Sequence, residues 1–93
     1  MYLLRYSKDF SRSLRRHIAS GKFSMSEFER TVDLLRAGDP LPPKYRDHAL
    51  TGEYVGCREC HIRGNLLLIY EKHDDVLVLV MIDVGTHHEL FGL

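Results

Sequence analysis

The sequence predicts an α+β fold: an N-terminal strand, a hairpin of two helices, and then an antiparallel β-meander. Apolar residues recur every three or four positions in two stretches of the first half, which is the spacing of amphipathic helices. The second half contains apolar runs of strand length separated by short turn sequences. The chain has 93 residues, of which 44% are hydrophobic, and each half alone would be too small to bury a core. We therefore expect a single domain over residues 1–93.

The first strand and the first helix are predicted over residues 2–6 and 8–20. The segment at residues 2–6 is short and largely apolar, as expected of a strand. Within residues 8–20, apolar side chains lie four positions apart on one face, and basic side chains gather on the other. The apolar set is Phe10, Leu14 and Ile18, and the basic set is Lys8, Arg12, Arg15 and Arg16. Gly21 suits the end of this helix, because glycine readily adopts the left-handed conformation found there.

The second helix is predicted between Ser24 and Gly38. The sequence Ser-Met-Ser-Glu at residues 24–27 is a capping-box pattern, in which side chains satisfy the free backbone N–H groups of the first turn. The apolar face of this helix is Met25, Phe28, Val32 and Leu35. Residues 39–52 contain all three prolines of the chain, which predicts an irregular loop. Loops of that length inside a compact domain are usually functional or disordered.

The three strands of the meander are predicted over residues 53–62, 66–72 and 76–84. Turn sequences at residues 63–65 and 73–75 separate them, and Gly56 marks a candidate β-bulge in the first of the three. The middle run is largely apolar, as expected of a central strand. Gly-Thr at residues 85–86 ends the last strand, and residues 87–93 form a short tail.

The charges of the chain cancel, with 13 lysines and arginines against 13 aspartates and glutamates. This balance excludes a uniformly basic body that binds nucleic acid through its overall charge. It is uneven along the chain, since residues 1–46 carry ten basic and five acidic residues and the remainder carries the opposite excess. Five of the six histidines lie in the acidic half. A local basic site is compatible with this distribution.

The N-terminus lacks the apolar run of a secretory signal, and no stretch approaches the roughly 18 apolar residues of a membrane span. Two cysteines do not make a disulfide framework. We therefore expect a soluble, cytoplasmic protein that does not associate with a membrane.

The string Cys57-Arg58-Glu59-Cys60-His61 has the spacing of a c-type haem attachment site, half a zinc site or a redox pair. Haem attachment requires export, and a cysteine-rich zinc site requires a second ligand pair that the sequence lacks. A redox pair normally opens a helix, whereas these cysteines fall in a predicted strand, where they would face opposite sides of the sheet. We interpret them as two ordinary strand cysteines.

The histidines are a better indication of function. In a meander, the turn at residues 63–65 and the end of the last strand lie at the same edge of the sheet. This places His61 and His87 close together, with the loop of His48 able to fold over them. Arg63 and Asn65 belong to the same edge. Such a cluster indicates acid–base catalysis, a three-histidine zinc site or chance.

Other candidate residues have simpler interpretations. His17, His73 and His88 are expected to be surface histidines without a role. The basic face of the first helix could bind a phosphate backbone or an acidic partner helix, although such faces are usually only solvated. Phe91 is either a core residue or a platform on which a base stacks.

Several linked motifs resemble those of a known family. The loop Leu41-Pro42-Pro43-Lys44-Tyr45-Arg46-Asp47-His48-Ala49-Leu50-Thr51-Gly52 is similar to that of the YafQ-type branch of the RelE/ParE toxin superfamily. So are the opening Tyr6-Ser7-Lys8-Asp9-Phe10, the run Gly56-Cys57-Arg58-Glu59-Cys60-His61-Ile62 followed by Leu67-Leu68-Ile69-Tyr70, and the ending Gly85-Thr86-His87-His88-Glu89-Leu90-Phe91-Gly92. The resemblance spans nearly the whole chain and implies the RelE-like fold.

The resemblance implies a toxin of a bacterial type II toxin–antitoxin system. Such toxins are ribosome-dependent endoribonucleases that cut mRNA, inhibit translation and are silenced by a cognate antitoxin. They need no metal or other cofactor, because the 2′-OH of the substrate attacks the adjacent phosphate. That reaction requires a base, an acid and positive charge near the phosphate.

Matching the family motifs residue by residue gives a set of expected site residues. The expected catalytic residues are His48, His61, His87 and Asn65, with acid or base duty on His48 and His87. The expected RNA-binding residues are Lys44, Arg46, Arg63 and Phe91. The antitoxin is expected to bind the first helix at Arg12, Arg15 and Arg16, where an acidic or amphipathic helix could lie.

Two departures from the family pattern predict a weakened activity. Asn65 stands where the family usually carries an aspartate, and an amide cannot accept a proton as a base at neutral pH. Asp83 stands where an arginine is common, and its charge would repel a phosphate. Two other functions remain as alternatives. One is a ParE-like or catalytically weakened toxin that acts by binding a protein such as gyrase, and the other is a metal-binding module.

Overall fold

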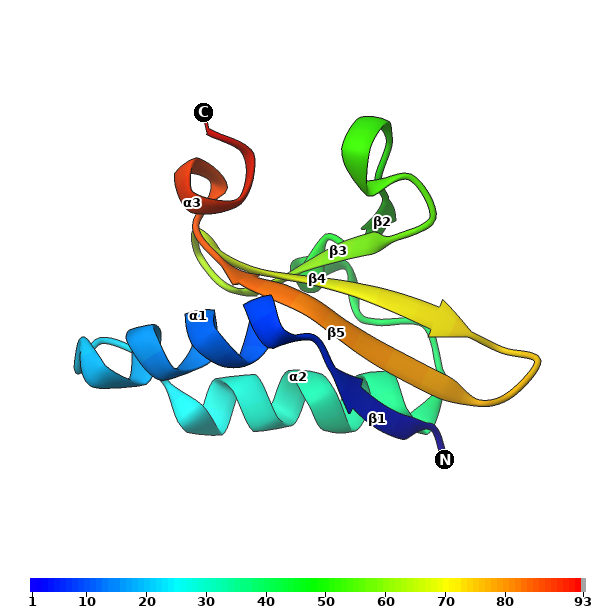
Figure 1. Ribbon diagram of the computed structural model, residues 1–93. Helices are drawn as coiled ribbons and strands as arrows, with labels where there is room; N and C mark the ends of the chain where they lie inside the picture. The colour runs from blue at the N-terminus through cyan, green and yellow to red at the C-terminus, as the bar shows by residue number, and fades with distance from the viewer. Residues whose placement is uncertain (93) are drawn as a thin grey trace.

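The computed structural model describes residues 1–92 and has the predicted α+β architecture (Figure 1). The elements in chain order are β1 Leu3–Tyr6, α1 Lys8–Ala19, α2 Met25–Ala37, the 3-10 helix η1 Pro43–Tyr45, β2 His48–Ala49, the 3-10 helix η2 Gly52–Tyr54, β3 Arg58–Arg63, β4 Leu66–His73, β5 Val78–Gly85 and α3 His87–Phe91. No helix within residues 1–92 is long and apolar enough to cross a membrane.

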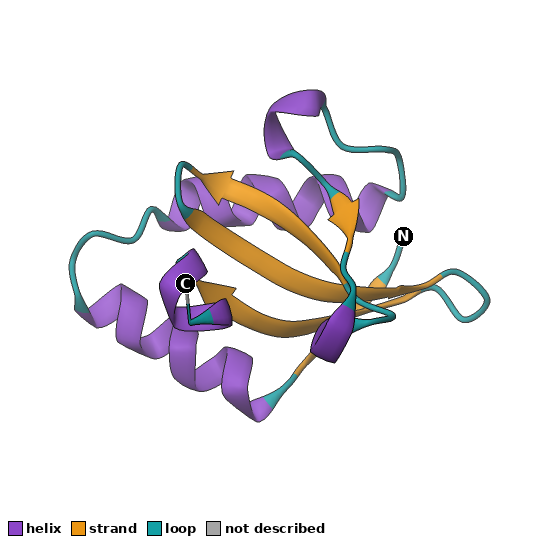
Figure 2. Ribbon diagram, turned by 90° about the horizontal axis from the view of Figure 1, so that it is seen from above, coloured by secondary structure: helices purple, strands orange, loops and turns teal. Residues whose placement is uncertain are grey.

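A five-stranded sheet in the order β1-β5-β4-β3-β2 forms the middle layer. The predicted antiparallel meander is confirmed by β3, β4 and β5. The sheet is mixed, however, because β1 pairs in parallel with β5. The helices α1 and α2 cover one face, while α3 and the segment around η2 lie on the other (Figure 1). Figure 2, which looks onto that second face, shows α3 over one end of the sheet.

Both long helices begin and end within a residue of their predicted limits. The hydroxyl of Ser7 accepts the backbone N–H of Phe10 at the start of α1, and that of Ser24 accepts the N–H of Glu27 at the start of α2. Each is a standard N-terminal cap. The predicted apolar faces are wrong at their ends, since Ile18 and Met25 are 46% and 40% exposed. The turn that joins the two helices extends past the end of the sheet (Figure 1), so the sheet gives the adjoining helix ends less cover than their middles.

The main core lies between the two long helices and the sheet, where Phe10, Phe28 and Leu35 pack against residues of every strand from β3 to β5. Side chains of a strand alternate between faces. Leu67 and Ile69 therefore point to the opposite side, and both are fully buried there. The second face is thus covered at its centre as well, which allows a shielded site to form on it.

Three segments differ from the prediction. The loop at residues 39–52 contains η1 and the short β2, which pairs with β3 and adds the fifth strand. The strand predicted over residues 53–62 begins only at Arg58, and Gly56 lies in the preceding turn with φ +92° rather than in a bulge. The register shifts that do occur lie after His61 and at Ile69. The predicted tail contains α3, and its last position, residue 93, lies outside the described residues.

The two cysteines are free, buried thiols. Cys60 lies in β3 as predicted, whereas Cys57 precedes that strand. Burial raises the pKa of both thiols, which holds them in the protonated form that is a poor nucleophile and a poor metal ligand. These observations favour the structural interpretation of both residues.

Candidate active site

Two of the predicted catalytic histidines contact the same buried carboxylate. The pairing of β2 with β3 sets His48 opposite Glu59, and His61 follows two residues along β3 on the same face. The Nε2 atoms of His48 and His61 lie 3.8 and 3.7 Å from Oε1 of Glu59. Glu59 is only 3% exposed. Both separations exceed hydrogen-bond length, so both Nε2 atoms remain open to a substrate.

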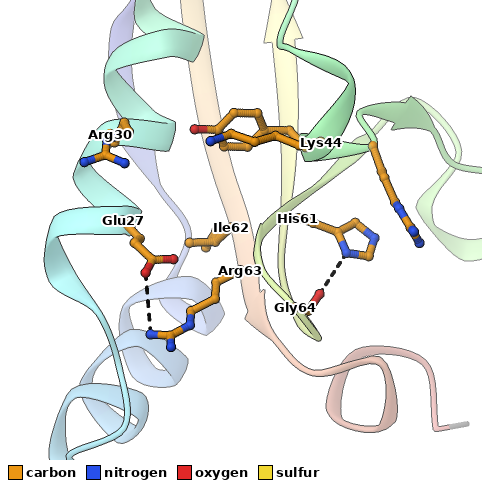
Figure 3. A pocket seen from close by; sticks show the side chains of 9 residues that line it. Glu27, Arg30, Lys44, His61, Ile62, Arg63 and Gly64 are labelled. Atoms are coloured by element: carbon orange, nitrogen blue, oxygen red, sulfur yellow. Dashed lines mark hydrogen bonds and ion pairs between the residues drawn. The ribbon is translucent and has the colours of Figure 1, made fainter.

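The other ring nitrogen of each histidine is fixed by a backbone carbonyl. Nδ1 of His48 lies 2.8 Å from the carbonyl oxygen of Arg46, and Nδ1 of His61 lies 2.9 Å from that of Gly64 (Figure 3). A carbonyl can only accept, so Nδ1 carries the proton in both rings. In the neutral state Nε2 is then the lone-pair nitrogen, and it faces Glu59.

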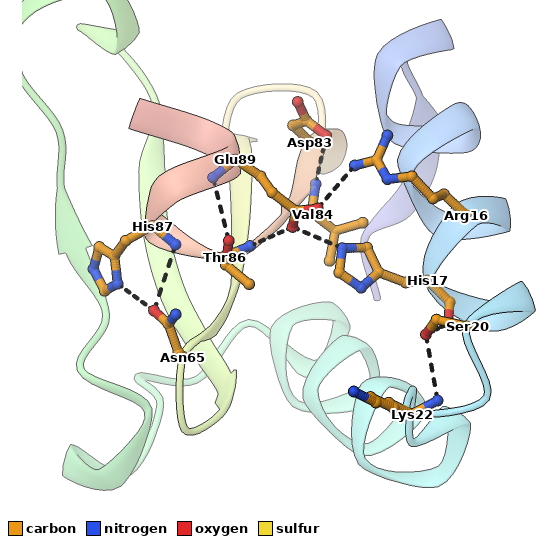
Figure 4. Close-up of polar contacts among 10 residues, drawn as sticks. All are labelled: Arg16, His17, Ser20, Lys22, Asn65, Asp83, Val84, Thr86, His87 and Glu89. Carbon is orange, nitrogen blue, oxygen red and sulfur yellow. Dashed lines mark hydrogen bonds and ion pairs between the residues drawn. The ribbon is translucent and has the colours of Figure 1, made fainter. Parts of the chain in front are cut away.

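His87 is oriented in the same way by Asn65. The backbone N–H of His87 donates to Oδ1 of Asn65 at 3.4 Å, which identifies that atom as the acceptor. Nδ1 of the His87 ring donates to the same oxygen at 2.5 Å (Figure 4). The rings of His61 and His87 have centroids 5.8 Å apart. The prediction that His48, His61, Asn65 and His87 lie close together is therefore confirmed.

Helix α3 positions His87, and Glu89 anchors this helix to α1. Thr86 and Glu89 form a complete capping box. Oε1 of Glu89 accepts the backbone N–H of Thr86 at 2.8 Å and faces Nε2 of His17 at 2.9 Å, while Oε2 lies 3.4 Å from a guanidinium nitrogen of Arg16 (Figure 4). The hydrogen bond from Thr86 is the main cause that lowers the pKa of Glu89. His17, which was expected to be a surface histidine without a role, therefore contacts the residue that caps α3.

Gly85 permits the close approach of this anchor. A Cβ added at residue 85 would lie 2.9 Å from Oε1 of Glu89, and that oxygen is already held by its hydrogen bonds. A side chain at this position would therefore displace the start of α3. The absence of a side chain at Gly85 thus contributes to the placement of His87.

Phe91 lies beside the histidines and outside the main core. Its ring centroid is 6.2 Å from that of His87 and 5.7 Å from that of Tyr54, the latter in an edge-to-face arrangement. Phe91 is partly exposed. This position fits the base-stacking interpretation better than the core interpretation.

The loop that carries His48 is attached to the sheet through Asp47. Its carboxylate accepts from the guanidinium of Arg58 at 3.2 and 3.3 Å and from the hydroxyl of Tyr70 at 2.5 Å. Asp47 raises the pKa of Arg58, and burial together with Asp47 raises that of Tyr70. Both donors therefore keep their protons, so the anchor persists over the physiological pH range.

The predicted RNA-binding side chains Lys44, Arg46 and Arg63 line one groove of about 660 Å³ between α2, η1 and β3 (Figure 3). Arg30 of α2 lines it as well, and His61 forms part of its wall. Phe91 does not line this groove.

The remaining predicted residues lie on α1 and β5. Arg12, Arg15 and Arg16 are exposed on α1, where Arg12 pairs with Asp9 at 3.5 Å. Asp83 lies on the Glu59 face of the sheet, because β3, β4 and β5 pair Glu59 with Ile69 and Ile69 with Asp83. Its carboxylate accepts the backbone N–H of Val84 at 2.8 Å.

Three site residues were missing from the prediction: Glu59, Glu89 and Arg30. The spacing of Glu59 and His61, two residues apart in a strand, is a signal that both share a face. Thr86 and Glu89 are three residues apart, which is the capping-box signal. Arg30 gives no such signal, because its place beside the loop depends on the packing of α2 on β3.

The site has the groups of a proton-transfer centre and also those of a metal site. Glu59, His61 and His87 each offer a ligand atom, and these atoms lie within 4.8 Å of one another. Two histidines and a carboxylate are a common ligand set for zinc. Proton transfer and metal binding would compete for the same lone pairs.

Residues 2–92 match the family described as the bacterial toxin of type II toxin-antitoxin system, YafQ. The chain belongs to the YafQ family of toxins. It is 35% identical over 91 residues to the mRNA interferase toxin YafQ of Escherichia coli K12, covering 98% of this chain and 92% of that protein.

Solved structures of YafQ-like proteins share the fold. The chain is similar to one in the crystal structure of the E. coli DinJ-YafQ toxin-antitoxin complex, with a TM-score of 0.86, 32% identity and 98% coverage of both chains. It is also similar to a metal-bound toxin from Helicobacter pylori, with a TM-score of 0.87, 34% identity, and coverage of 98% of this chain and 100% of that one.

Proposed function

We propose that this YafQ-family toxin is an mRNA interferase, an endoribonuclease that cuts mRNA on the ribosome and is neutralised by a cognate antitoxin. The observation that carries the proposal is the convergence of His48, His61 and His87, each with Nδ1 fixed by an oxygen acceptor. The similar E. coli protein is an mRNA interferase toxin, and a similar chain occurs in a toxin–antitoxin complex. We infer a cytoplasmic location from this function, because mRNA and ribosomes are in the cytoplasm of a bacterial cell.

The reaction requires two proton transfers at one phosphate. A base removes the proton of the 2′-OH, and the 2′-oxygen forms a bond to the adjacent phosphorus. The bond from phosphorus to the 5′-oxygen breaks, and an acid supplies a proton to that oxygen. The products are a 2′,3′-cyclic phosphate and a free 5′-OH, and neither step needs a metal or a cofactor.

We assign the acid and base duties to His48 and His87, and proton transfer or phosphate binding to His61. Histidine suits both duties because each protonation state is accessible near neutral pH. Asn65 orients His87. Glu59 faces Nε2 of both other histidines, and its negative charge would favour their protonated forms.

We further assign RNA binding to Lys44, Arg46, Arg63 and Phe91. The first three line the groove beside His61, and the exposed part of the Phe91 ring is suited to stack on a base. We assign antitoxin binding to the exposed basic face of α1, at Arg12, Arg15 and Arg16, where acidic side chains of a partner would be attracted.

Gyrase poisoning is not favoured as the function. A protein that acts only by binding another protein gains nothing from three imidazoles with oriented lone pairs, and the similar E. coli toxin is an mRNA interferase.

The test uses purified toxin and mRNA in a translating extract. We expect His87→Ala to slow cleavage by at least about 100-fold, which is the lower range for loss of a general acid or base. His73→Gln is the matched control, because His73 lies in β4 and contacts Glu71. Equal cleavage by His87→Ala and the wild type would remove the catalytic assignment. In cells that express the toxin, growth arrest with intact mRNA and an induced DNA-damage response would favour gyrase as the target instead.

A further inference from the structure

The groove beside His61 concentrates positive charge in a molecule whose net charge is zero. Arg30, Lys44, Arg46 and Arg63 line it, and Glu27 is the one acidic side chain among its lining residues. Figure 3 shows Arg30 on α2, Lys44 beside η1 and Arg63 at the end of β3, on different sides of this hollow. We call this hollow the basic groove.

Most of this charge is not neutralised by the protein itself. Within residues 1–92, Arg63 is the member of the set that forms an ion pair, with Glu27 at 3.5 Å. Lys44 lies over the ring of Tyr45 at 5.3 Å, which leaves its charge free to act on a ligand. All four cationic residues are exposed. Their mutual repulsion costs stability, and a polyanion in the groove would relieve it.

The basic groove is joined to the catalytic cluster through two residues. The ring of His61 forms part of its wall. Arg46 lines the groove, and its backbone carbonyl accepts the Nδ1 proton of His48. Arg46 adopts the left-handed backbone conformation, with φ +49°, in which its N–H reaches the carbonyl of Pro43. A non-glycine residue in this conformation is strained by about 1 kcal/mol, and here it allows one residue to serve both sites.

We propose that the basic groove binds the phosphates of the RNA strand next to the bond that is cut, and that Arg30 is a member of this site. The proposal rests on the proposed function, because it places the scissile phosphate at His61. An acidic segment of a protein partner is the competing ligand for such a groove. RNA is favoured because a catalytic side chain lines the groove and because Arg46 couples it to His48.

The ion pair between Arg63 and Glu27 gives the site a built-in competitor. Both side chains are solvent-accessible, at 64% and 36%, so the pair is weak and a phosphate can replace the carboxylate. Glu27 therefore lowers the affinity for RNA. Its removal should tighten binding, which is the opposite of what removal of Arg30 should do.

The experiment measures the affinity of the His87→Ala protein for a short single-stranded RNA as a function of salt. Each lost phosphate contact should reduce the slope of log K against log salt by about 0.7. This corresponds to about fivefold weaker binding at 0.1 M salt. We expect this result for Arg30→Gln, and tighter binding with a steeper slope for Glu27→Gln. The surface position of both side chains makes misfolding a minor concern, and circular dichroism checks it.

Lys22→Gln is the matched control. Lys22 lines a neighbouring groove of about 410 Å³ that shares Arg63 with the basic groove. An unchanged slope for Lys22→Gln assigns the RNA to the basic groove. A reduced slope for Lys22→Gln with none for Arg30→Gln overturns the proposal, as does weaker antitoxin binding by Arg30→Gln with unchanged RNA binding. The affinity for RNA is measured without cleavage. A result that contradicts RNA binding in the basic groove is therefore distinct from one that contradicts the catalytic assignment.

Discussion

Asn65 shows how one residue decides the state of a catalytic histidine. Its side-chain oxygen accepts both the backbone N–H and Nδ1–H of His87, and this leaves Nε2 as the lone-pair nitrogen in the neutral ring. An aspartate at this position would accept the same two protons. The departure from the family pattern therefore preserves the orientation of His87 and removes a negative charge.

Replacement of Asn65 separates orientation from charge. We expect Asn65→Ala to slow mRNA cleavage about tenfold, as is typical when the partner that orients a functional histidine is lost. Asn65→Asp should retain cleavage within a few-fold of the wild type and shift its pH profile. Single-turnover cleavage in a translating extract measures both variants. Cleavage by Asn65→Ala at the rate of the wild type would show that Asn65 does not orient His87.

The same residues show what a sequence can predict at this scale. The sequence predicts that His61, Asn65 and His87 lie together, because they fall at one edge of a meander, and that the loop of His48 can fold over them. Glu59 lies inside the Cys-x-x-Cys-His string, and this string gives no indication of the contact with His48. Its role depends on β2, since the pairing of this strand brings His48 opposite it. A two-residue strand has too few residues to show a periodic pattern.

Helix α3 depends on a charged anchor, so its attachment should vary with pH. The pKa of Glu89 is lowered in the folded protein, mainly by the backbone N–H of Thr86. The ionised carboxylate therefore contributes stability above its ordinary pKa of about 4.3. This contribution is lost as the pH falls through the lowered value.

We expect Glu89→Gln to be less stable than the wild type at pH 7 by under about 1 kcal/mol, because the carboxylate is partly exposed and screened by solvent. The difference should vanish as Glu89 itself becomes protonated in acid. Urea unfolding from pH 3 to 7 measures it, and the cleavage rate at pH 7 should fall because α3 carries His87. A difference that stays constant down to pH 3 would contradict the anchor.

The loop that carries His48 should be the most sensitive element of the site. Asp47→Ala removes the acceptor of Arg58 and of Tyr70, and a buried donor left unpaired costs about 1–3 kcal/mol. We expect a loss of stability of that size and slower cleavage, since the position of His48 relaxes. Asp75→Ala, at an exposed turn, is the control and should change stability by less than about 0.5 kcal/mol. Unfolding midpoints and cleavage rates are measured for both variants. A loss of stability in Asp47→Ala without slower cleavage would show that this anchor does not position His48.

At the scale of the whole molecule, the zero net charge describes the sum and not the surface. The basic excess of residues 1–46 supplies Arg30, Lys44 and Arg46 of the basic groove, and Arg63 comes from the acidic half. The charge asymmetry was visible in the sequence, whereas the meeting of α2, the loop and β3 around one hollow was not. Such a meeting depends on tertiary packing, and no local pattern encodes it. The parallel pairing of β1 with β5 was missed for the same reason.

That pairing makes the single-domain prediction testable. The strand β1, near the start of the chain, pairs with β5, and the core joins Tyr2 to residues as distant as Val84. We therefore expect one cooperative transition in urea, with coincident curves from far-UV circular dichroism and from the fluorescence of the five tyrosines, since the chain has no tryptophan. Leu79→Ala, at a fully buried position of β5, should lower both midpoints together at a cost of about 2–5 kcal/mol. Curves that separate, or a midpoint that shifts for one probe alone, would show that the helices and the sheet unfold as independent units.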